Sequence, residues 1–155
     1  QLIGRSTGIA LENPTYKQAF RVFESLGHPI FPVSMDEWGM KVKELEKTQA
    51  RIAYVMPSHQ YPTGIVIPIK RRQELLKWAK KQEGRYLIED DYDSEFRYKG
   101  RPIPALQGMD DSQKVIYMGT FSRSIAPAIR VGFMVLPEPL LALYREKAGF
   151  IYGCR

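Results

Sequence analysis

The chain has 155 residues, a length that normally folds as one domain with a hydrophobic core of its own. Hydrophobic residues make up 44% of it and charged residues 26%, which is ordinary for a globular protein, and its single cysteine excludes an internal disulfide. No apolar run could span a bilayer and no signal-peptide pattern opens the sequence, so we expect a cytoplasmic protein without a membrane partner.

Short apolar strands alternate with amphipathic helices along the chain, which predicts an α/β fold with a mostly parallel sheet flanked by helices. Proline, glycine and other turn residues mark the boundaries, and apolar residues three and four positions apart mark the helices. The expected strands are residues 8–12, 29–33, 51–56, 85–89, 114–118 and 129–136. The expected helices are residues 14–26, 39–47, 69–83 and 137–147, with Pro14 near the first position of the first helix.

The net charge of +6 raises the question of nucleic-acid binding. The densest basic stretch falls on the third expected helix, beside apolar residues at helical spacing. We interpret it as a solvated helix face, because no zinc-finger spacing or RNA-binding aromatic motif accompanies the charge. Its members are Lys70, Arg71, Arg72, Lys77, Lys80 and Lys81.

Three polar loops follow expected strands, at residues 57–64, 89–95 and 119–124. In open α/β sheets ligands bind outside the carboxyl ends of the strands, so these loops should converge on one edge. Together they would supply carboxylates, hydroxyls and arginines, which suits an anionic ligand with a basic ring nitrogen. No spacing of His, Cys and carboxylates indicates a metal site.

The loop after the fifth expected strand carries a recognisable motif. Residues 117–127 read YMGTFSRSIAP and are followed by Arg130, which resembles the cofactor-lysine loop G-T-F-S-K-x-x-x-P-x-x-R of pyridoxal-phosphate (PLP) enzymes with the aspartate aminotransferase fold. Residues 57–64, PSHQYPTG, resemble the aminotransferase loop P-x-x-x-N-P-T-G. With IEDDYDSEFRY at 88–98, they are similar to the MocR subgroup of GntR-type transcription regulators.

Those regulators join a winged helix-turn-helix DNA-binding domain to an aminotransferase-like domain that senses PLP and small amines or amino acids. The resemblance covers nearly the whole chain. It implies that residues 1–155 are part of an aspartate-aminotransferase-like PLP large domain, with PLP as cofactor and a small amine or amino acid as effector. We expect the winged helix, an upstream phosphate loop and a C-terminal small domain to lie outside this chain, in a longer protein that forms a homodimer and contacts DNA only through the winged helix.

The resemblance also assigns cofactor contacts. Asp90 matches the aspartate that pairs with the pyridine nitrogen and keeps it protonated. Tyr92 matches the tyrosine at the phenolic oxygen of the ring, and Tyr16 the aromatic residue that stacks on the ring. Arg130 matches the arginine that binds the phosphate, a role that suits a planar and always charged group. Two hydroxyls could add donors, those of Thr120 and Ser122.

From the residues alone, blander interpretations of the same positions stay open. Asp90 could belong to a solvated acidic turn, and Tyr16 could be a core residue. Thr120 and Ser122 could serve only the chemistry of a turn.

Arg123 stands where the motif has its catalytic lysine. A deprotonated lysine amine attacks the PLP aldehyde, whereas a guanidinium stays protonated and makes a poor Schiff-base partner. We therefore predict that this chain forms no internal aldimine and has no transaminase activity.

Two other interpretations stay open. The chain could be a piece of a metabolic PLP-dependent aminotransferase that transfers amino groups between amino acids and 2-oxo acids. It could also be a pseudoenzyme or a dissected subdomain kept for structure or assembly, as Arg123 would allow. Tyr61 stands where ordinary aminotransferases have asparagine and the MocR subgroup has an aromatic residue, so it favours the regulator.

Overall fold

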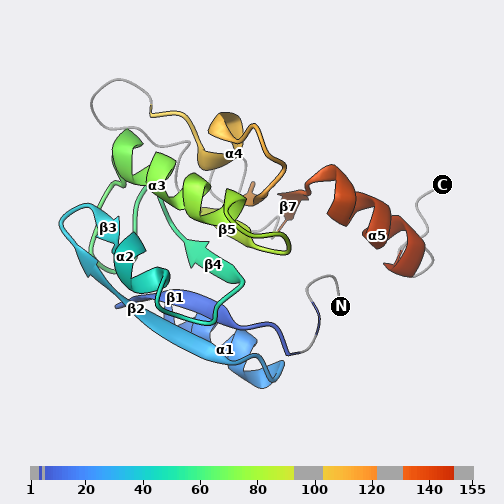
Figure 1. Cartoon of the computed structure of the whole chain (residues 1–155), viewed down its shortest axis with the longest axis horizontal. Coiled ribbons are helices and arrows are strands. Elements are labelled where there is room, and N and C mark those ends of the chain that lie inside the picture. The colour runs from blue at the N-terminus through green and yellow to red at the C-terminus, as the bar shows by residue number, and fades with distance from the viewer. Residues whose placement is uncertain (1–3, 5, 93–102, 122–130, 149–155) are drawn as a thin grey trace.

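A twisted sheet forms the centre of the computed structural model, which describes residues 4, 6–92, 103–121 and 131–148. Within these residues the sheet has seven strands in the order β3-β2-β1-β4-β5-β6-β7 (Figure 1). Neighbours from β2 through β6 pair in parallel, and β3 and β7 pair antiparallel at the two edges. The prediction of a mostly parallel α/β sheet is thus confirmed. The strands are β1 Ile9–Asn13, β2 Ile30–Asp36, β3 Gly39–Met40, β4 Ile52–Val55, β5 Tyr86–Asp91, β6 Val115–Thr120 and β7 Gly132–Val135.

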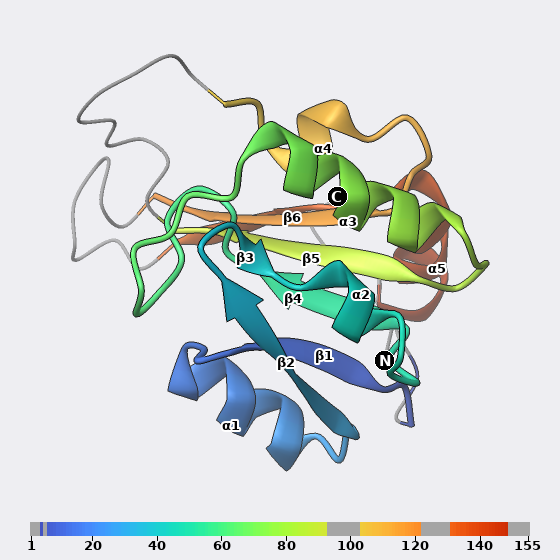
Figure 2. The same ribbon diagram turned by 60° about the vertical axis from the view of Figure 1, so that its left-hand side comes forward.

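Helices cover both faces of the sheet (Figure 2). Helices α1 (Lys17–Ser25) and α5 (Glu138–Ala148) pack on one face, where they bury one hydrophobic cluster. Helices α2 (Val42–Leu45), α3 (Ile69–Lys80) and α4 (Leu106–Met109) pack on the other face over a second cluster. We call these the α1 face and the α3 face. Among the described residues, no helix is both long and apolar enough to cross a membrane.

Strand alternation sorts the side chains between the two clusters. On β4, Tyr54 lies on the α1 face, whereas Ala53 and Val55 lie on the α3 face. On β5, Ile88 faces α1 and Leu87 faces α3. All five are buried, so β4 and β5 form the centre of both hydrophobic layers.

The segment expected as a helix over residues 39–47 instead forms a short strand followed by a four-residue helix. Gly39 and Met40 form β3, which turns back on β2 with Asp36 paired to Gly39 and Met35 to Met40. Gly39 adopts φ +99°, a backbone conformation that side chains disfavour, and the Trp38 N–H donates to the Asp36 carboxylate across the turn at 2.9 Å. The hairpin therefore occupies the residues expected for the first helical turn, and α2 is short.

Other expected boundaries differ as well, and strand β2 runs to Asp36 instead of residue 33. Helix α1 begins only at Lys17, after an extended Tyr16, so Pro14 does not lie near its first position. Strands β5 and β6 run further than expected, because parallel pairing continues from Asp90 with Met118 to Asp91 with Gly119. The two aspartates expected in a loop therefore belong to a strand.

Candidate functional site

The polar residues at the carboxyl end of β5 divide between the two faces of the sheet. Asp90 lies on the α1 face and accepts a hydrogen bond from the Tyr54 hydroxyl of β4. Asp91 lies on the α3 face and accepts one from the Tyr117 hydroxyl of β6 at 2.7 Å. Asp90 is half-buried and Asp91 is buried. The interpretation of Asp90 as part of a solvated acidic turn is therefore wrong.

Burial raises the pKa of Asp90, and the charge of Asp91 raises it further, whereas the hydrogen bond from Tyr54 lowers it. Burial and the nearby Asp90 charge likewise raise the pKa of Tyr54, so the phenol keeps its proton and donates. No other hydrogen bond to the Asp90 carboxylate occurs within the described ranges. Such a carboxylate can accept a hydrogen bond from a protonated ring nitrogen.

Aromatic rings from three chain segments surround this edge. Tyr16, just before α1, meets Tyr61 of the loop after β4 edge to face, with ring centroids 5.8 Å apart. The imidazole of His59, from the same loop, stacks on Tyr92 at the end of β5, with a centroid distance of 6.2 Å. Tyr16 is 42% exposed, so its interpretation as a core residue is wrong. Tyr16 is the residue just before α1, and α1 packs on the face of the sheet that carries Tyr54 and Asp90, so Tyr16 belongs to that side.

Thr120 ends β6 on the same face as Asp90, since Asp90 is in register with Met118. Its hydroxyl donates to the carbonyl of Val131 at 3.3 Å, across the connection between β6 and β7. Three further predicted site residues, Ser122, Arg123 and Arg130, lie outside the described residues, and their placement stays a prediction. In the part of the chain that the structure describes, no group of three metal-binding side chains occurs.

Arg72, near the start of α3, is fully buried, so its interpretation as part of a solvated helix face is wrong. Its guanidinium donates to three backbone carbonyls: Ile67 at 2.8 Å, Pro57 at 2.7 Å and Pro104 at 2.9 Å. These carbonyls come from both ends of the loop after β4 and from the chain before α4. A rigid planar fork of donors can satisfy all three at once. We call this arrangement the Arg72 clamp.

Glu89 completes the attachment of α4. Its buried carboxylate accepts the backbone N–H groups of Leu106 and Gln107, each at 2.9 Å. Burial raises the pKa of Glu89, whereas these two hydrogen bonds and the nearby Arg72 charge lower it by less. A four-residue helix that sequence periodicity did not predict is thus fixed by a strand residue 17 positions earlier.

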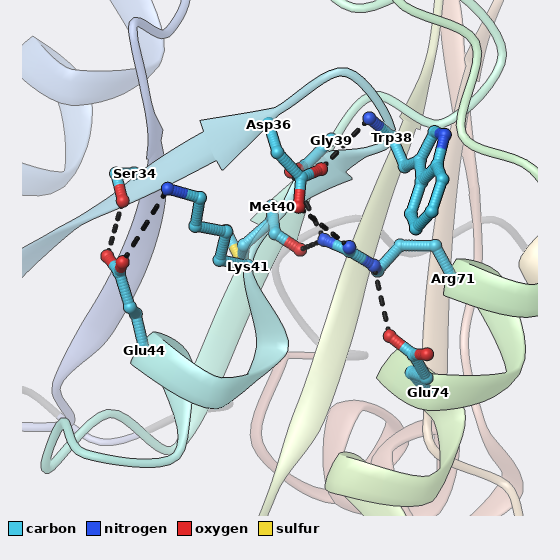
Figure 3. Close-up of polar contacts among 9 residues, drawn as sticks. All are labelled: Ser34, Asp36, Trp38, Gly39, Met40, Lys41, Glu44, Arg71 and Glu74. Atoms are coloured by element: carbon cyan, nitrogen blue, oxygen red, sulfur yellow. Dashed lines mark hydrogen bonds and ion pairs between the residues drawn. The ribbon is translucent and has the colours of Figure 1, made fainter.

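Arg71 is also buried and holds the β2–β3 hairpin against α3 (Figure 3). It donates to the carbonyls of Gly39 and Met40, and its ion pairs join it to Asp36 at 2.9 Å and to Glu74 at 3.0 Å. Its guanidinium lies 6.0 Å from the ring centre of Trp38. The solvated interpretation is therefore wrong for Arg71 as well. It is confirmed for the exposed lysines of this stretch, Lys70, Lys77, Lys80 and Lys81.

Glu12, at the end of β1, is a buried acid that the sequence did not single out. It is 1% exposed, and neither carboxylate oxygen has a partner of hydrogen-bond geometry among the described residues. Burial raises its pKa to about 8, although the Met56 backbone and the Gln60 amide are close enough to oppose this. Gln60 itself donates to the Pro14 carbonyl at 2.9 Å and accepts from the Thr63 N–H at 3.0 Å, so Glu12 lies beneath the loop after β4.

Comparisons with known proteins agree with this geometry. The family model described as "Aminotransferase class I and II" matches residues 1–155. The HTH-type transcriptional regulator YdeL of Bacillus subtilis, described as uncharacterized, is 44% identical over 91% of this chain and 30% of its own length. The probable rhizopine catabolism regulatory protein MocR of Rhizobium meliloti is 38% identical over 84% of this chain and 26% of its own. The chain thus spans less than a third of either regulator.

Among solved structures, the kynurenine aminotransferase of Pyrococcus horikoshii, in complex with PMP, superposes with a TM-score of 0.86 and is 30% identical. The alignment covers 99% of this chain and 41% of that one. The family match and this structure imply pyridoxal phosphate as the cofactor.

The Arg72 clamp generates a stability prediction. Arg72→Met should lower the free energy of unfolding by about 3–5 kcal/mol, because it leaves three carbonyls and the buried Glu89 charge without their cation. The exposed neighbour Lys70→Met should change it by less than about 0.5 kcal/mol. Urea denaturation of both variants measures the difference, and equal effects would contradict the clamp.

Glu12 generates a prediction about pH. The folded protein should hold a proton at Glu12 up to about pH 8, whereas the unfolded chain releases it near its ordinary value of 4.5. The folded state then binds more protons over this window, so stability should fall as pH rises, by up to about 1.4 kcal/mol per pH unit. Glu12→Gln should remove this part of the pH dependence, as followed by denaturation at pH 5 to 8. An unchanged slope would mean that Glu12 is ionised in the folded protein.

Proposed function

This chain belongs to the aminotransferase class I and II family, and we propose that it is part of the PLP- and effector-sensing large domain of a MocR-type transcription regulator. The observation that carries the proposal is the Asp90 carboxylate, held by Tyr54 at the carboxyl edge of β5 on the side of Tyr16. The likeness to two HTH-type regulators supports a regulator over an enzyme, as does the aromatic Tyr61 in the loop after β4.

The described residues fit this cofactor by their chemistry. PLP supplies an electron sink when its ring nitrogen is protonated. Asp90 would hold the proton at that nitrogen, and the exposed ring of Tyr16 would cover one face of the pyridine. Tyr92, steadied by its stacking on His59, would donate to the phenolic oxygen. Thr120 lies on the same face of the sheet and could add a hydroxyl.

The residues outside the described ranges complete the proposal. Arg130, with Ser122, would bind the phosphate group. Arg123 would contribute charge without a covalent bond, since a guanidinium does not attack an aldehyde at neutral pH. This chain would therefore bind PLP reversibly, and a small amine or amino acid would act as the effector. In the full-length protein, a cytoplasmic homodimer would pass this signal to a winged helix on DNA.

A second candidate is a piece of a metabolic PLP aminotransferase. The likeness to a solved kynurenine aminotransferase at 30% identity favours it. Arg123 and Tyr61 weigh against it, since both depart from the residues expected of such an enzyme.

Schiff-base formation between PLP and the residue at position 123 provides the test of this proposal. Reduction of a PLP mixture with borohydride should leave no adduct on the peptide that contains Arg123. In the full-length protein, Arg123→Lys should give a yellow complex that borohydride fixes on the same peptide, because it supplies the missing nucleophile. Arg21→Lys, which adds a lysine at an exposed position of α1, is the matched control and should give no such product. An adduct on Arg123, or a colourless lysine variant with PLP in excess, would overturn the assignment of this loop.

A further inference from the structure

Strand β5 carries two phenol–carboxylate pairs of matching design. Tyr54 of β4 lies in register with Ile88 and reaches Asp90, two residues further along β5. Tyr117 of β6 lies in register with Glu89 and reaches Asp91, again two residues further. The two pairs come from opposite neighbouring strands and lie on opposite faces of the sheet. Both pairs thus join a tyrosine hydroxyl to an aspartate two residues beyond the register partner of the tyrosine. Only the surroundings of the two pairs differ.

The surroundings separate the two pairs. Tyr117 and Asp91 lie on the α3 face, on the same side as the Glu89 carboxylate that holds α4. Tyr54 and Asp90 lie on the α1 face, where Tyr16 is near and its ring is exposed. An exposed aromatic ring lies near each pair, since the Phe133 ring is 37% exposed and its centre lies 6.0 Å from that of Tyr117. The two pairs therefore differ in the face of the sheet that they occupy and in the helices that cover it.

Tyr54 is rigidly held. Its side chain is 3% exposed within the cluster of the α1 face, and its ring meets Phe23 of α1 edge to face with centroids 5.8 Å apart. A buried phenol has to place its hydroxyl on a partner, and here that partner is one oxygen of Asp90. The carboxylate is thereby fixed in orientation, because strand packing fixes its donor.

We propose that Tyr54 is a positioning residue for Asp90: it occupies one carboxylate oxygen, holds the group in its ionised form and leaves the other oxygen for the cofactor ring nitrogen. This inference rests on the proposed function, because it assigns Asp90 to that nitrogen. Tyr54 would act on the cofactor through Asp90.

The charges around the pair make this contact necessary. Burial and Asp91 both raise the pKa of Asp90, and the hydrogen bond from Tyr54 is the contact that opposes them. Burial and the Asp90 charge raise the pKa of Tyr54, so the phenol keeps its proton and can donate it in the hydrogen bond. Without the phenol, nothing among the described residues would stabilise the Asp90 charge.

The first experiment needs no cofactor. The Asp90 carboxyl carbon is titrated by ¹³C NMR in the wild type, in Tyr54→Phe and in Tyr117→Phe. The Tyr54 variant should raise the Asp90 midpoint by about one pH unit or more, because it removes a hydrogen bond to a charged group. Tyr117→Phe removes an equivalent hydroxyl from the other face and should leave that midpoint within a few tenths. Both variants keep the ring, and circular dichroism checks that they fold. An Asp90 midpoint that Tyr54→Phe leaves unchanged would overturn the inference.

The second experiment separates this inference from the proposed function. In the full-length protein, Tyr54→Phe should weaken PLP binding by about tenfold, Tyr117→Phe should not, and Asp90→Asn should weaken it at least as much as Tyr54→Phe. Tyr54→Phe added to Asp90→Asn should have no further effect. If Asp90→Asn binds PLP as tightly as the wild type while the titration shifts as expected, the Tyr54–Asp90 pair is upheld and the cofactor role of Asp90 is overturned.

Discussion

The buried guanidinium of Arg72 is the contact on which the carboxyl edge of the sheet depends. The Arg72 side chain donates to the carbonyls of Pro57, Ile67 and Pro104, which belong to connecting segments, and the Pro57 carbonyl also accepts the Ile67 N–H. A buried carbonyl that loses its partner, as the Ile67 carbonyl would without Arg72, costs about 1–3 kcal/mol. An exposed ion pair contributes only about 0–1 kcal/mol. The pair between Lys80 and Asp111 is of the second kind, with side chains 61% and 79% exposed. The buried arginine therefore matters more to the fold than the surface charges.

Strand alternation divides the three acids of β5 between the two faces of the sheet. On the α3 face, Glu89 accepts the first N–H groups of α4, and Asp91 accepts the Tyr117 hydroxyl. On the α1 face, Asp90 has Tyr54 as its donor and lies near the exposed ring of Tyr16. Three consecutive acids thus have three different partners, and strand alternation keeps their functions apart. The carboxylate that we propose for cofactor binding, Asp90, thus lies between two carboxylates that hold the structure together.

Sequence periodicity predicted the parallel sheet and the long helices, because their apolar residues repeat at the period of the element. It failed where a partner distant in the chain decides the outcome. Two residues such as Gly39 and Met40 form a strand only because β2 pairs with them, and α4 depends on Glu89. Arg71 and Arg72 were expected in solvent because charged side chains on a helix are usually exposed. In the structure both are buried, and they donate to backbone carbonyls up to 32 residues away. The proposed cofactor role of Asp90 comes from a motif resemblance, whereas its burial and its donor Tyr54 follow from the extension of β5, which the sequence did not predict.

In the proposed complex, Asp90 keeps the cofactor ring nitrogen protonated. PLP labelled with ¹⁵N in its ring tests this claim directly when bound to the full-length protein, because the ¹⁵N chemical shift separates a protonated from an unprotonated pyridine. The account predicts a protonated ring nitrogen at neutral pH in the wild type and in Asp91→Asn, and loss of that proton in Asp90→Asn. A ring nitrogen that stays protonated in Asp90→Asn, or loses its proton in Asp91→Asn instead, would contradict it.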